Sequence, residues 1–301
     1  MRVFVTGATG FVGSAVVREL LGAGHSVLGL ARNDANAAAL AEAGAEALRG
    51  DLSDIKALQS GAEQADAVAH LAFIHDFSKF AENSAIDKAA IEAIGEVLIG
   101  TEKPLLVTSG VAVLPQGRVV TELEVAQHHF PRKSEETAIE LAERGVKASA
   151  VRLPPTTHGA GDHGFVPGLI DIARAKGVAA YVGDGTNHWP ATHRADAAVV
   201  YRLALEKPTA GVRYHAIAEE GVEFRAIAEV IGRRLGVPVV SKTPEEAMEH
   251  FGFLGMFVGA DVRASSAWTR ETLGWAPKQP GLLADLDTEE YFAGSSKYSR
   301  P

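Results

Sequence analysis

The chain has 301 residues, of which 47% are hydrophobic and 22% charged, and its formal net charge is −9. This composition is ordinary for a globular protein, and the acidic balance argues against a nucleic-acid partner, because phosphate binding depends on clustered Lys and Arg. The chain contains no cysteine, which excludes disulfides and thiolate metal sites and fits a cytoplasmic enzyme. No stretch approaches the roughly 20 apolar residues that a membrane span requires, so we expect no membrane association.

A glycine-rich turn follows the first apolar run of the chain. Residues 6–13 read Thr-Gly-Ala-Thr-Gly-Phe-Val-Gly and lead into the helical pattern of Ser14 to Leu21. Between a strand and a helix, Gly7 can take the tight turn, Gly10 can let a pyrophosphate approach the backbone, and Gly13 can let the helix pack on the strand. The free N–H groups of the new helix would then face the phosphates. The pattern predicts a dinucleotide site.

Short valine-rich runs alternate with amphipathic stretches over the first half of the chain. The expected strands after the first one are 26–31, 45–49, 65–70, 105–108 and 148–153, and the expected helices are 35–43, 55–62, 77–98 and 134–144. This alternation is typical of repeated β-α units and predicts a parallel sheet with helices on both faces. The six strands fit a doubly wound α/β fold.

The second half of the chain is less regular, because glycines break it into loops, where function tends to concentrate. Beyond these loops we expect a helix at 195–205, a strand at 212–216 and helices at 224–235 and 244–251. We therefore predict a dinucleotide-binding domain formed by 1–160 and 193–217, and a substrate-binding lobe formed by 161–192 and 218–301.

The spacing Thr-Gly-x-x-Gly-x-x-Gly resembles that of the short-chain dehydrogenase/reductase superfamily, in particular its extended, epimerase/dehydratase-like branch and its atypical branch. The resemblance continues in Gly50-Asp51-Leu52, Ala69-His70-Leu71-Ala72, His193-Arg194-Ala195-Asp196-Ala197 and Leu273-Gly274-Trp275-Ala276-Pro277. It implies a Rossmann fold, a nicotinamide dinucleotide and a small-molecule substrate. The cofactor contacts that it implies are Gly7, Thr9, Gly10, Phe11, Val12, Gly13, Asp51, Leu52, Leu71, Ala72, Thr108 and Pro154.

The end of the second strand bears on the choice between NAD and NADP. NAD-selective sites hold an acidic residue about 20 residues past the glycines, where it binds the ribose 2′-OH. This chain has Arg32 there. A guanidinium suits a 2′-phosphate, and no carboxylate at that position would repel it. The sequence thus favours NADP over NAD, although Asp34 would weaken this preference and Arg32 has the alternative role of a solvated loop residue.

The Tyr-x-x-x-Lys pair of active superfamily members is missing from this chain. Glu136 falls four residues after Arg132, as an acidic residue often does after the family's lysine, so alignment places Arg132 on the lysine and His128 on the tyrosine. This His-x-x-x-Arg arrangement resembles an atypical subgroup of the superfamily. A histidine with a pKa near 6.5 can give and take a proton at neutral pH, whereas an arginine would hold the ribose. A register shifted by one residue would pair His129 with Lys133, and a surface position is the alternative for His128.

The family's serine, which hydrogen-bonds the substrate oxygen, aligns with Gly110, so the neighbouring Ser109 is our candidate for that role. We expect the substrate pocket to include His158, His163, Tyr181 and Trp189. The two aromatic residues are equally compatible with a buried core position. The sequence contains no His-x-x-x-His or His-x-Glu pair, so we expect no metal site.

The leading hypothesis is an NADP-dependent oxidoreductase that acts on a carbonyl or hydroxyl group of a small organic molecule, with His128 exchanging the proton. A sugar-nucleotide epimerase or dehydratase is a second hypothesis, which the missing tyrosine weakens. A non-catalytic NADP-binding redox sensor is a third, motivated by the loss of the Tyr-Lys pair. A homodimer is compatible with the sequence, and the substrate is not identified by it.

Overall fold

The computed structural model describes residues 1–126 and 130–293. Its main element is a seven-stranded parallel sheet in the order β11-β7-β5-β4-β1-β2-β3. These strands are β1 (Arg2–Thr6), β2 (Ser26–Ala31), β3 (Glu46–Arg49), β4 (Ala67–His70), β5 (Pro104–Gly110), β7 (Lys147–Leu153) and β11 (Arg213–His215). The strand order reverses at β1, because β2 lies on one side of it and β4 on the other. In such sheets ligands bind at the carboxyl ends of the strands beside this switch point.

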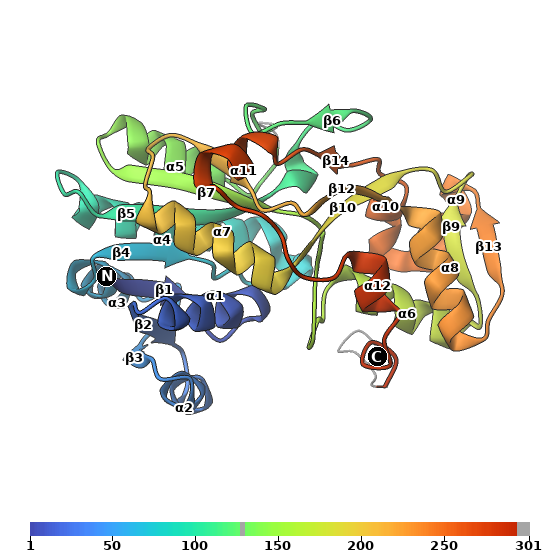
Figure 1. Ribbon diagram of the computed structural model, residues 1–301, viewed down its shortest axis with the longest axis horizontal. Coiled ribbons are helices and arrows are strands. Elements are labelled where there is room, and N and C mark those ends of the chain that lie inside the picture. Colours follow the sequence, from blue (N-terminus) through green and yellow to red (C-terminus); the bar gives the residue numbers. More distant parts are fainter. Residues whose placement is uncertain (127–129, 294–301) are drawn as a thin grey trace.

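Helices cover both faces of the sheet (Figure 1). One face packs against α1 (Phe11–Gly22), α7 (Arg194–Glu206) and Leu40 of α2 (Asp34–Glu42). The other face packs against α3 (Ile55–Gln64), α4 (Phe80–Leu98) and α5 (Ser134–Glu143). Within β1, Val3 and Val5 face the first core and Phe4 the second, because side chains alternate along a strand. Burial of both faces explains the continuous apolar runs, and the predicted doubly wound fold is confirmed.

One predicted strand is confirmed, and one predicted helix begins differently in the structure. The strand expected at 212–216 joins the sheet as its seventh strand, β11, at the edge beside β7. The sequence pattern of residues 212–216 did not indicate that β7, about 60 residues earlier in the chain, would be the neighbouring strand. The helix expected at 77–98 begins instead with a 3₁₀ turn, Phe77–Lys79, where the Asp76 carboxylate accepts from the backbone N–H of Ser78. The α-helix then starts at Phe80.

Most of the remaining elements form a lobe beside the main sheet, seen at the right of Figure 1, whereas residues 267–273 pack against α7 and β11. The strands outside the main sheet pair in the orders β12-β10-β8, β13-β9 and β14-β6. They are β6 (Val119–Val120), β8 (Thr156–His158), β9 (Ala179–Val182), β10 (His188–His193), β12 (Glu219–Glu223), β13 (Val239–Lys242) and β14 (Arg263–Ala264). The helices are α6 (Phe165–Lys176), α8 (Phe224–Leu235), α9 (Pro244–Phe251), α10 (Gly255–Val258), α11 (Ala267–Leu273) and α12 (Leu282–Leu286), and 3₁₀ turns occupy Val111–Val113 and Gly252–Leu254.

The lobe has a hydrophobic core of its own, which includes Trp189, Phe224 and Phe251. The exact domain boundaries expected from the sequence stay a prediction. Over the described residues, none of the helices combines the length and the apolar character that crossing a membrane would require.

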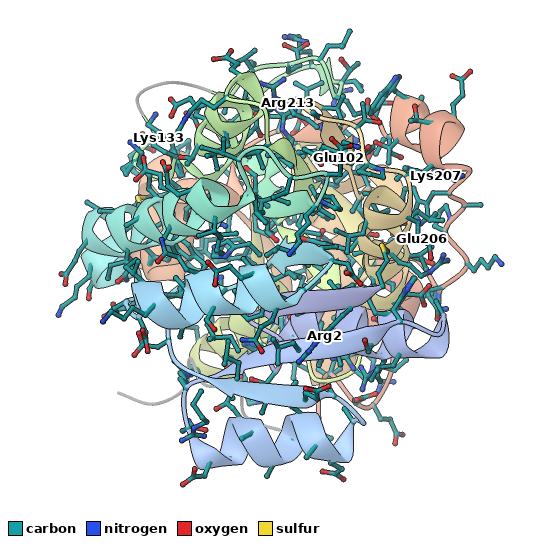
Figure 2. The ribbon with its side chains drawn as sticks, turned by 90° about the vertical axis from the view of Figure 1, so that its left-hand side faces the viewer. Arg2, Glu102, Lys133, Glu206, Lys207 and Arg213 are labelled. Carbon is teal, nitrogen blue, oxygen red and sulfur yellow. The ribbon has the colours of Figure 1, made fainter. Side chains whose placement is uncertain are left out.

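A buried charge network joins α5 to the edge of the main sheet. Glu135 accepts two hydrogen bonds from Arg152, at 2.6 and 2.7 Å, and one from Arg213 at 2.6 Å. Burial alone would raise the pKa of the Glu135 carboxyl, but the two arginines hold it below its usual value. Burial, with the neighbouring charge of Arg152, lowers the pKa of His215 to about 4. Arg213 and Lys133, both in the upper half of Figure 2, mark the side of the molecule that carries α5.

Candidate functional site

The turn between β1 and α1 is built from glycines in close contact. Gly7 has a φ of +67°, and a Cβ there would lie 2.8 Å from the backbone nitrogen of Ala72. A Cβ on Gly13 would lie 2.0 Å from the carbonyl oxygen of Gly7, so α1 packs directly on the turn. A Cβ on Gly10 would have one neighbour within 4 Å among the described residues, the Gly7 oxygen at 3.1 Å. The turn therefore needs Gly7 and Gly13 for its own geometry, whereas a side chain at Gly10 would meet one tight contact that a small shift relieves.

The N-terminus of α1 is the centre of this turn. Gly10 is the N-cap residue, and no side chain caps the helix there. The first N–H groups of a helix have no partner within it and carry its positive end. The side chain of Asn36 hydrogen-bonds to Thr9 Oγ1, which fixes the turn against α2. A diphosphate fits this cradle, because backbone donors point into it and only a missing side chain keeps it open.

Arg32 lies at the carboxyl end of β2 and is exposed to solvent. Within the described part of the chain it has no ion pair or side-chain hydrogen bond. Asn33 next to it caps α2 by accepting from the N–H of Asn36 at 2.8 Å. Asp34, the carboxylate that would oppose a phosphate, pairs with Arg49 at 3.0 Å. Arg32 is thus available to a ligand at this strand end, and Asp34 already has an oppositely charged partner.

Other predicted cofactor contacts lie at the ends of neighbouring strands. Asp51 follows β3 and accepts from the N–H of Ser53 at 2.7 Å, and Leu52 beside it is buried. Leu71 follows β4 and donates its N–H to the Thr6 carbonyl at 3.3 Å. Pro154 is buried directly after β7. The structure thus brings these residues to the same edge of the sheet as the glycine turn.

Arg132 is fixed at the carboxyl end of β5, two residues before α5 begins. Its Nη2 donates to the carbonyl oxygen of Thr108 at 2.9 Å, and its Nε donates to Ser134 Oγ at 2.8 Å. Its guanidinium carbon lies 4.2 Å from the ring centroid of Phe73, which follows β4. The guanidinium therefore bridges the ends of two adjacent strands, β4 and β5, and its side chain remains 21% exposed.

A buried polar network connects Arg132 to the glycine turn. His70 lies 3.0 Å from Thr6 Oγ1 through Nδ1 and 3.1 Å from Asp87 Oδ1 through Nε2. Ser134 donates to Asp87 Oδ2 at 2.5 Å, and the Nε atom of Arg132 lies 4.0 Å from the same oxygen. Burial acts to raise the pKa of the Asp87 carboxyl, but His70, Arg132 and Ser134 together bring it below its usual value. The Asp87 carboxylate therefore links His70 to Ser134 and Arg132.

His70 and Asp87 are functional candidates that the sequence analysis did not identify. His70 belongs to the motif at residues 69–72, so its place at the end of β4 was visible in the sequence, although its partner was not. Asp87 lies in the middle of a long helix, and no local pattern distinguishes it from a solvated carboxylate. Their pairing arises because α4 packs across the end of β4.

Ser109 and Thr108 lie side by side at the end of β5. Thr108 Oγ1 donates to the carbonyl of His70 and accepts from the hydroxyl of Tyr201, both at 2.8 Å. Because successive side chains of a strand point to opposite faces, Ser109 points away from Tyr201. Ser109 is 8% exposed and lies one residue from the carbonyl that anchors Arg132. Its predicted contact with a substrate oxygen stays a prediction.

Comparison with known proteins places this geometry in a family. Residues 3–99 match the NAD dependent epimerase/dehydratase family. A protein of Schizosaccharomyces pombe without an assigned function is 54% identical over 295 residues, which cover 97% of this chain and 100% of the relative. The chain belongs to the NAD-dependent epimerase/dehydratase family. It is an NAD(P)-binding oxidoreductase of the extended short-chain dehydrogenase/reductase kind, as the sequence motifs predicted.

Two further comparisons show the range of this family. A 2-alkyl-3-oxoalkanoate reductase of Stenotrophomonas maltophilia is 29% identical over 262 residues, covering 80% of this chain and 78% of the relative. The crystal structure of a putative epimerase from Burkholderia cenocepacia J2315 superimposes with a TM-score of 0.75 at 22% identity and covers 97% of both chains. At 22% identity, the similarity to the Burkholderia structure shows a shared fold. Reductases and epimerases therefore both occur among the proteins that this family member resembles.

The predicted proton donor of this family member, His128, and its alternative His129 lie outside the described residues. The two candidate cations that follow them differ in position. Arg132 points to the strand ends, whereas the Nζ of Lys133 lies 3.0 Å from Glu136 Oε1 on α5. Of these two cations, Arg132 is the one that contacts the end of β5 at the dinucleotide edge of the sheet.

Two of the predicted pocket residues lie near the loop that follows β8. The ring of His163 meets the ring of Phe11 edge to face, with centroids 5.7 Å apart, so it lies beside the start of α1. His158 is fully buried, and its Nδ1 lies 2.7 Å from Asp285 Oδ2. Across the described residues, no three His, Asp or Glu side chains form a group that could hold a metal ion.

The other two predicted pocket residues belong to the lobe. Trp189 is 1% exposed and packs edge to face on Phe224, with centroids 4.9 Å apart. Trp189 therefore takes the core position that was its alternative, because the lobe needs a large apolar side chain between its sheet and α8. Tyr181 on β9 lies under the guanidinium of Arg225, 5.4 Å from the ring centroid.

Proposed function

We propose that this protein is an NADP-dependent oxidoreductase that acts on the carbonyl or hydroxyl group of a small, apolar organic molecule. The observation that carries the proposal is Arg132, which Thr108 and Phe73 hold at the strand ends beside the glycine turn. When bound, the nicotinamide supplies or accepts the hydride. The chain's own residues then have to orient the reactants, exclude water and move one proton.

The preference for NADP is supported by charge. Arg32 is exposed at the end of β2, where the adenosine ribose would lie, and Asp34 is already paired with Arg49 at 3.0 Å. A guanidinium can bind a phosphate through two parallel hydrogen bonds, which an unphosphorylated ribose does not offer. We therefore expect Arg32 to bind the 2′-phosphate.

Each catalytic candidate has a distinct proposed role. Arg132 holds a ribose hydroxyl, and it cannot serve as a general acid because a guanidinium stays protonated. Ser109, one residue from the carbonyl that anchors Arg132, donates a hydrogen bond to the substrate oxygen. His128, four residues before Arg132 in the sequence, gives the proton to that oxygen or takes it back.

An aromatic cluster beside Arg132 supports an apolar substrate. The ring centroids of Phe73 and Phe80 are 5.9 Å apart, and those of Phe80 and Phe130 are 5.5 Å apart. All three phenylalanines remain partly accessible to solvent. Pockets for small organic molecules are lined mainly by such side chains, with few polar groups. The relative from Stenotrophomonas maltophilia is named as a 2-alkyl-3-oxoalkanoate reductase, and the alkyl chains of such an oxoalkanoate agree with this preference.

A sugar nucleotide is a weaker candidate, because its diphosphate needs cationic side chains with available donors. Three arginines of the lobe pair with carboxylates of the lobe itself: Arg225 with Glu229 at 2.9 Å, Arg263 with Asp261 at 3.1 Å, and Arg233 with Asp287 at 2.8 Å. A diphosphate bound by any of these arginines would have to displace its carboxylate partner. This internal pairing favours the apolar ketone over the sugar nucleotide.

Purified protein supplied with NADPH and a panel of alkyl and aryl ketones tests the proposal. We expect oxidation of NADPH with apolar ketones and slower turnover with polyhydroxylated ketones of the same size. His128→Phe should lower turnover about 10²- to 10⁴-fold and leave NADPH affinity unchanged, because it removes only a proton donor. Conversion of UDP-glucose without net NADPH oxidation would instead identify an epimerase.

A pair of neighbouring variants tests the role of Arg132. Arg132→Ala should weaken NADPH binding, because it removes the group that spans the strand ends. Lys133→Ala is the matched control, since it removes a cation one residue away that is paired with Glu136. If Lys133→Ala weakens NADPH binding and Arg132→Ala does not, the shifted register is correct.

A further inference from the structure

The loop formed by residues 159–164 lies against the glycine turn. It follows β8 and precedes α6, and its His163 ring packs edge to face on Phe11, the first residue of α1. Arg194 contacts Phe11 as well: its guanidinium carbon is 4.9 Å from the ring centroid. Phe11 is therefore held between the loop and the start of α7, at the helix end where the diphosphate would bind.

The loop has a fixed shape with one unused acceptor. Gly159 and Gly161 have φ values of +134° and +78°, which side chains rarely allow. The N–H of Asp162 donates to the carbonyl of Gly159 at 3.0 Å, and the N–H of Gly164 donates to Asp162 Oδ1 at 2.7 Å. These bonds close the loop on itself and leave Asp162 Oδ2 for a partner from another part of the chain.

That partner is Tyr291, near the end of the described chain. Its hydroxyl accepts from the N–H of Gly159 at 3.0 Å and donates to Asp162 Oδ2 at 3.2 Å. The same hydroxyl lies 3.5 Å from Asp285 Oδ2, which itself pairs with His158 at 2.7 Å. One phenol thus bonds to the first residue of the loop and to the Asp162 carboxylate within it, and the neighbouring Asp285 binds the last residue of β8.

The segment that carries Tyr291 is itself anchored to the lobe. Arg174 of α6 donates to the carbonyl of Phe292 at 3.3 Å, and the guanidinium carbon of Arg234 of α8 lies 5.4 Å from the Phe292 ring centroid. Figure 1 shows α12, just before this segment, next to α6. Tyr291 therefore reaches the loop from a fixed support.

We propose that Tyr291 is a positioning residue that fastens residues 159–164 against Phe11 and so slows the release of the bound dinucleotide. The proposal rests on the proposed function, because it requires a dinucleotide at the glycine turn. Closing such a loop excludes water and holds the bound molecule in one geometry. The phenol acts through the loop and does not itself touch the cofactor.

Tyr291→Phe is the direct test, because it keeps the ring and removes only the hydroxyl. We expect the rate constant for NADPH dissociation, measured by stopped-flow displacement, to rise about tenfold while the association rate stays the same. Amide hydrogen exchange of a peptide that covers residues 159–164 should become faster without any cofactor, since the N–H of Gly159 loses its acceptor. Tyr214→Phe is the matched control: it removes a phenol hydroxyl from β11 in the main sheet and should change neither measurement.

The outcomes separate this proposal from the proposed function. If the unmutated protein does not bind NADPH, the proposed function fails, whatever the exchange data show. If it binds NADPH and Tyr291→Phe releases it at the original rate, the positioning role is wrong, even where exchange of the loop is faster. Asp162→Ala is a second variant in case Tyr291→Phe does not fold, because it removes the acceptor of the phenol hydroxyl and leaves the C-terminal packing intact. Unchanged NADPH release in that variant would also overturn the proposal.

Discussion

Replacing Gly10 with valine should remove dinucleotide binding and leave the fold nearly intact. The backbone at Gly10 has φ −74° and ψ 175°, a conformation that valine adopts readily. The new Cβ would lie 3.1 Å from the Gly7 oxygen, a contact that a shift of a few tenths of an ångström relieves. With the loss of a glycine N-cap, we expect the free energy of unfolding to fall by about 1 kcal/mol.

The effect of Gly10→Val on binding should be larger. The isopropyl group would project over the N-terminus of α1, where the atom nearest to a Cβ on Gly10 is the Gly7 oxygen. A charge-assisted hydrogen bond contributes about 1.5–3 kcal/mol, so the loss of two such bonds to a diphosphate costs about 3–6 kcal/mol. This corresponds to a rise in the Kd for NADPH of about 10²- to 10⁴-fold. Fluorescence titration with NADPH measures the affinity, and thermal unfolding measures the stability.

Gly13→Ala is the contrasting variant from the same turn. Its Cβ would lie 2.0 Å from the Gly7 oxygen, a backbone atom that cannot move without displacing the turn. We expect it to lower the free energy of unfolding by about 1–3 kcal/mol or more, so it should lose stability where Gly10→Val keeps it. A folded Gly10→Val protein whose Kd for NADPH stays within tenfold of the original would refute the reasoning, because the diphosphate would then lie elsewhere.

Three further predictions concern charge. Arg32→Asp should make NADH bind more tightly than NADPH, because the new carboxylate repels the 2′-phosphate. Titrations of the variant with each cofactor would detect this. Arg233→Asp is a distant, exposed control that should leave NADPH the tighter-binding cofactor. Burial raises the pKa of Asp162 from 3.8 to about 6, so the folded protein binds more protons than the unfolded chain in that range. The free energy of unfolding should therefore fall as the pH rises from about 4 to about 6. Asp162→Asn lacks this titration. Urea unfolding at several pH values should show that the free energy of unfolding of this variant, relative to that of the unmutated protein, rises by up to ~3 kcal/mol from about pH 4 to about pH 6. A constant difference between the two proteins over this pH range would contradict the assignment. Glu135→Gln should lower the free energy of unfolding by about 3–5 kcal/mol, because it leaves the guanidinium of Arg152 buried without its anion, and a loss below 1 kcal/mol in calorimetry would show that water reaches the site.

Local sequence was sufficient to predict the cofactor turn and most of the elements. Gly7 needs a positive φ and Gly13 a close backbone contact, and both requirements appear as glycines at fixed spacing in the chain. Helices α8 and α9 begin and end at the residues that periodicity and Pro244 predicted. Backbone dihedral preferences and hydrophobic periodicity act over a few residues, so one sequence is enough to detect them.

The three-dimensional structure decided which distant side chains meet. His70 and Asp87 pair because α4 packs across β4, and Tyr291 bonds to Gly159 although 132 residues separate them. Trp189 lies in the core of the lobe because distant parts of the chain pack around it. The residues next to it in the sequence do not reveal this packing. Contacts of this kind depend on which strands become neighbours and which helices cover them. The sequence by itself therefore determined the fold class, the position of the glycine turn and the site of Arg32, whereas the network around Arg132 and the fastening of residues 159–164 exist only once the sheet and the lobe have assembled.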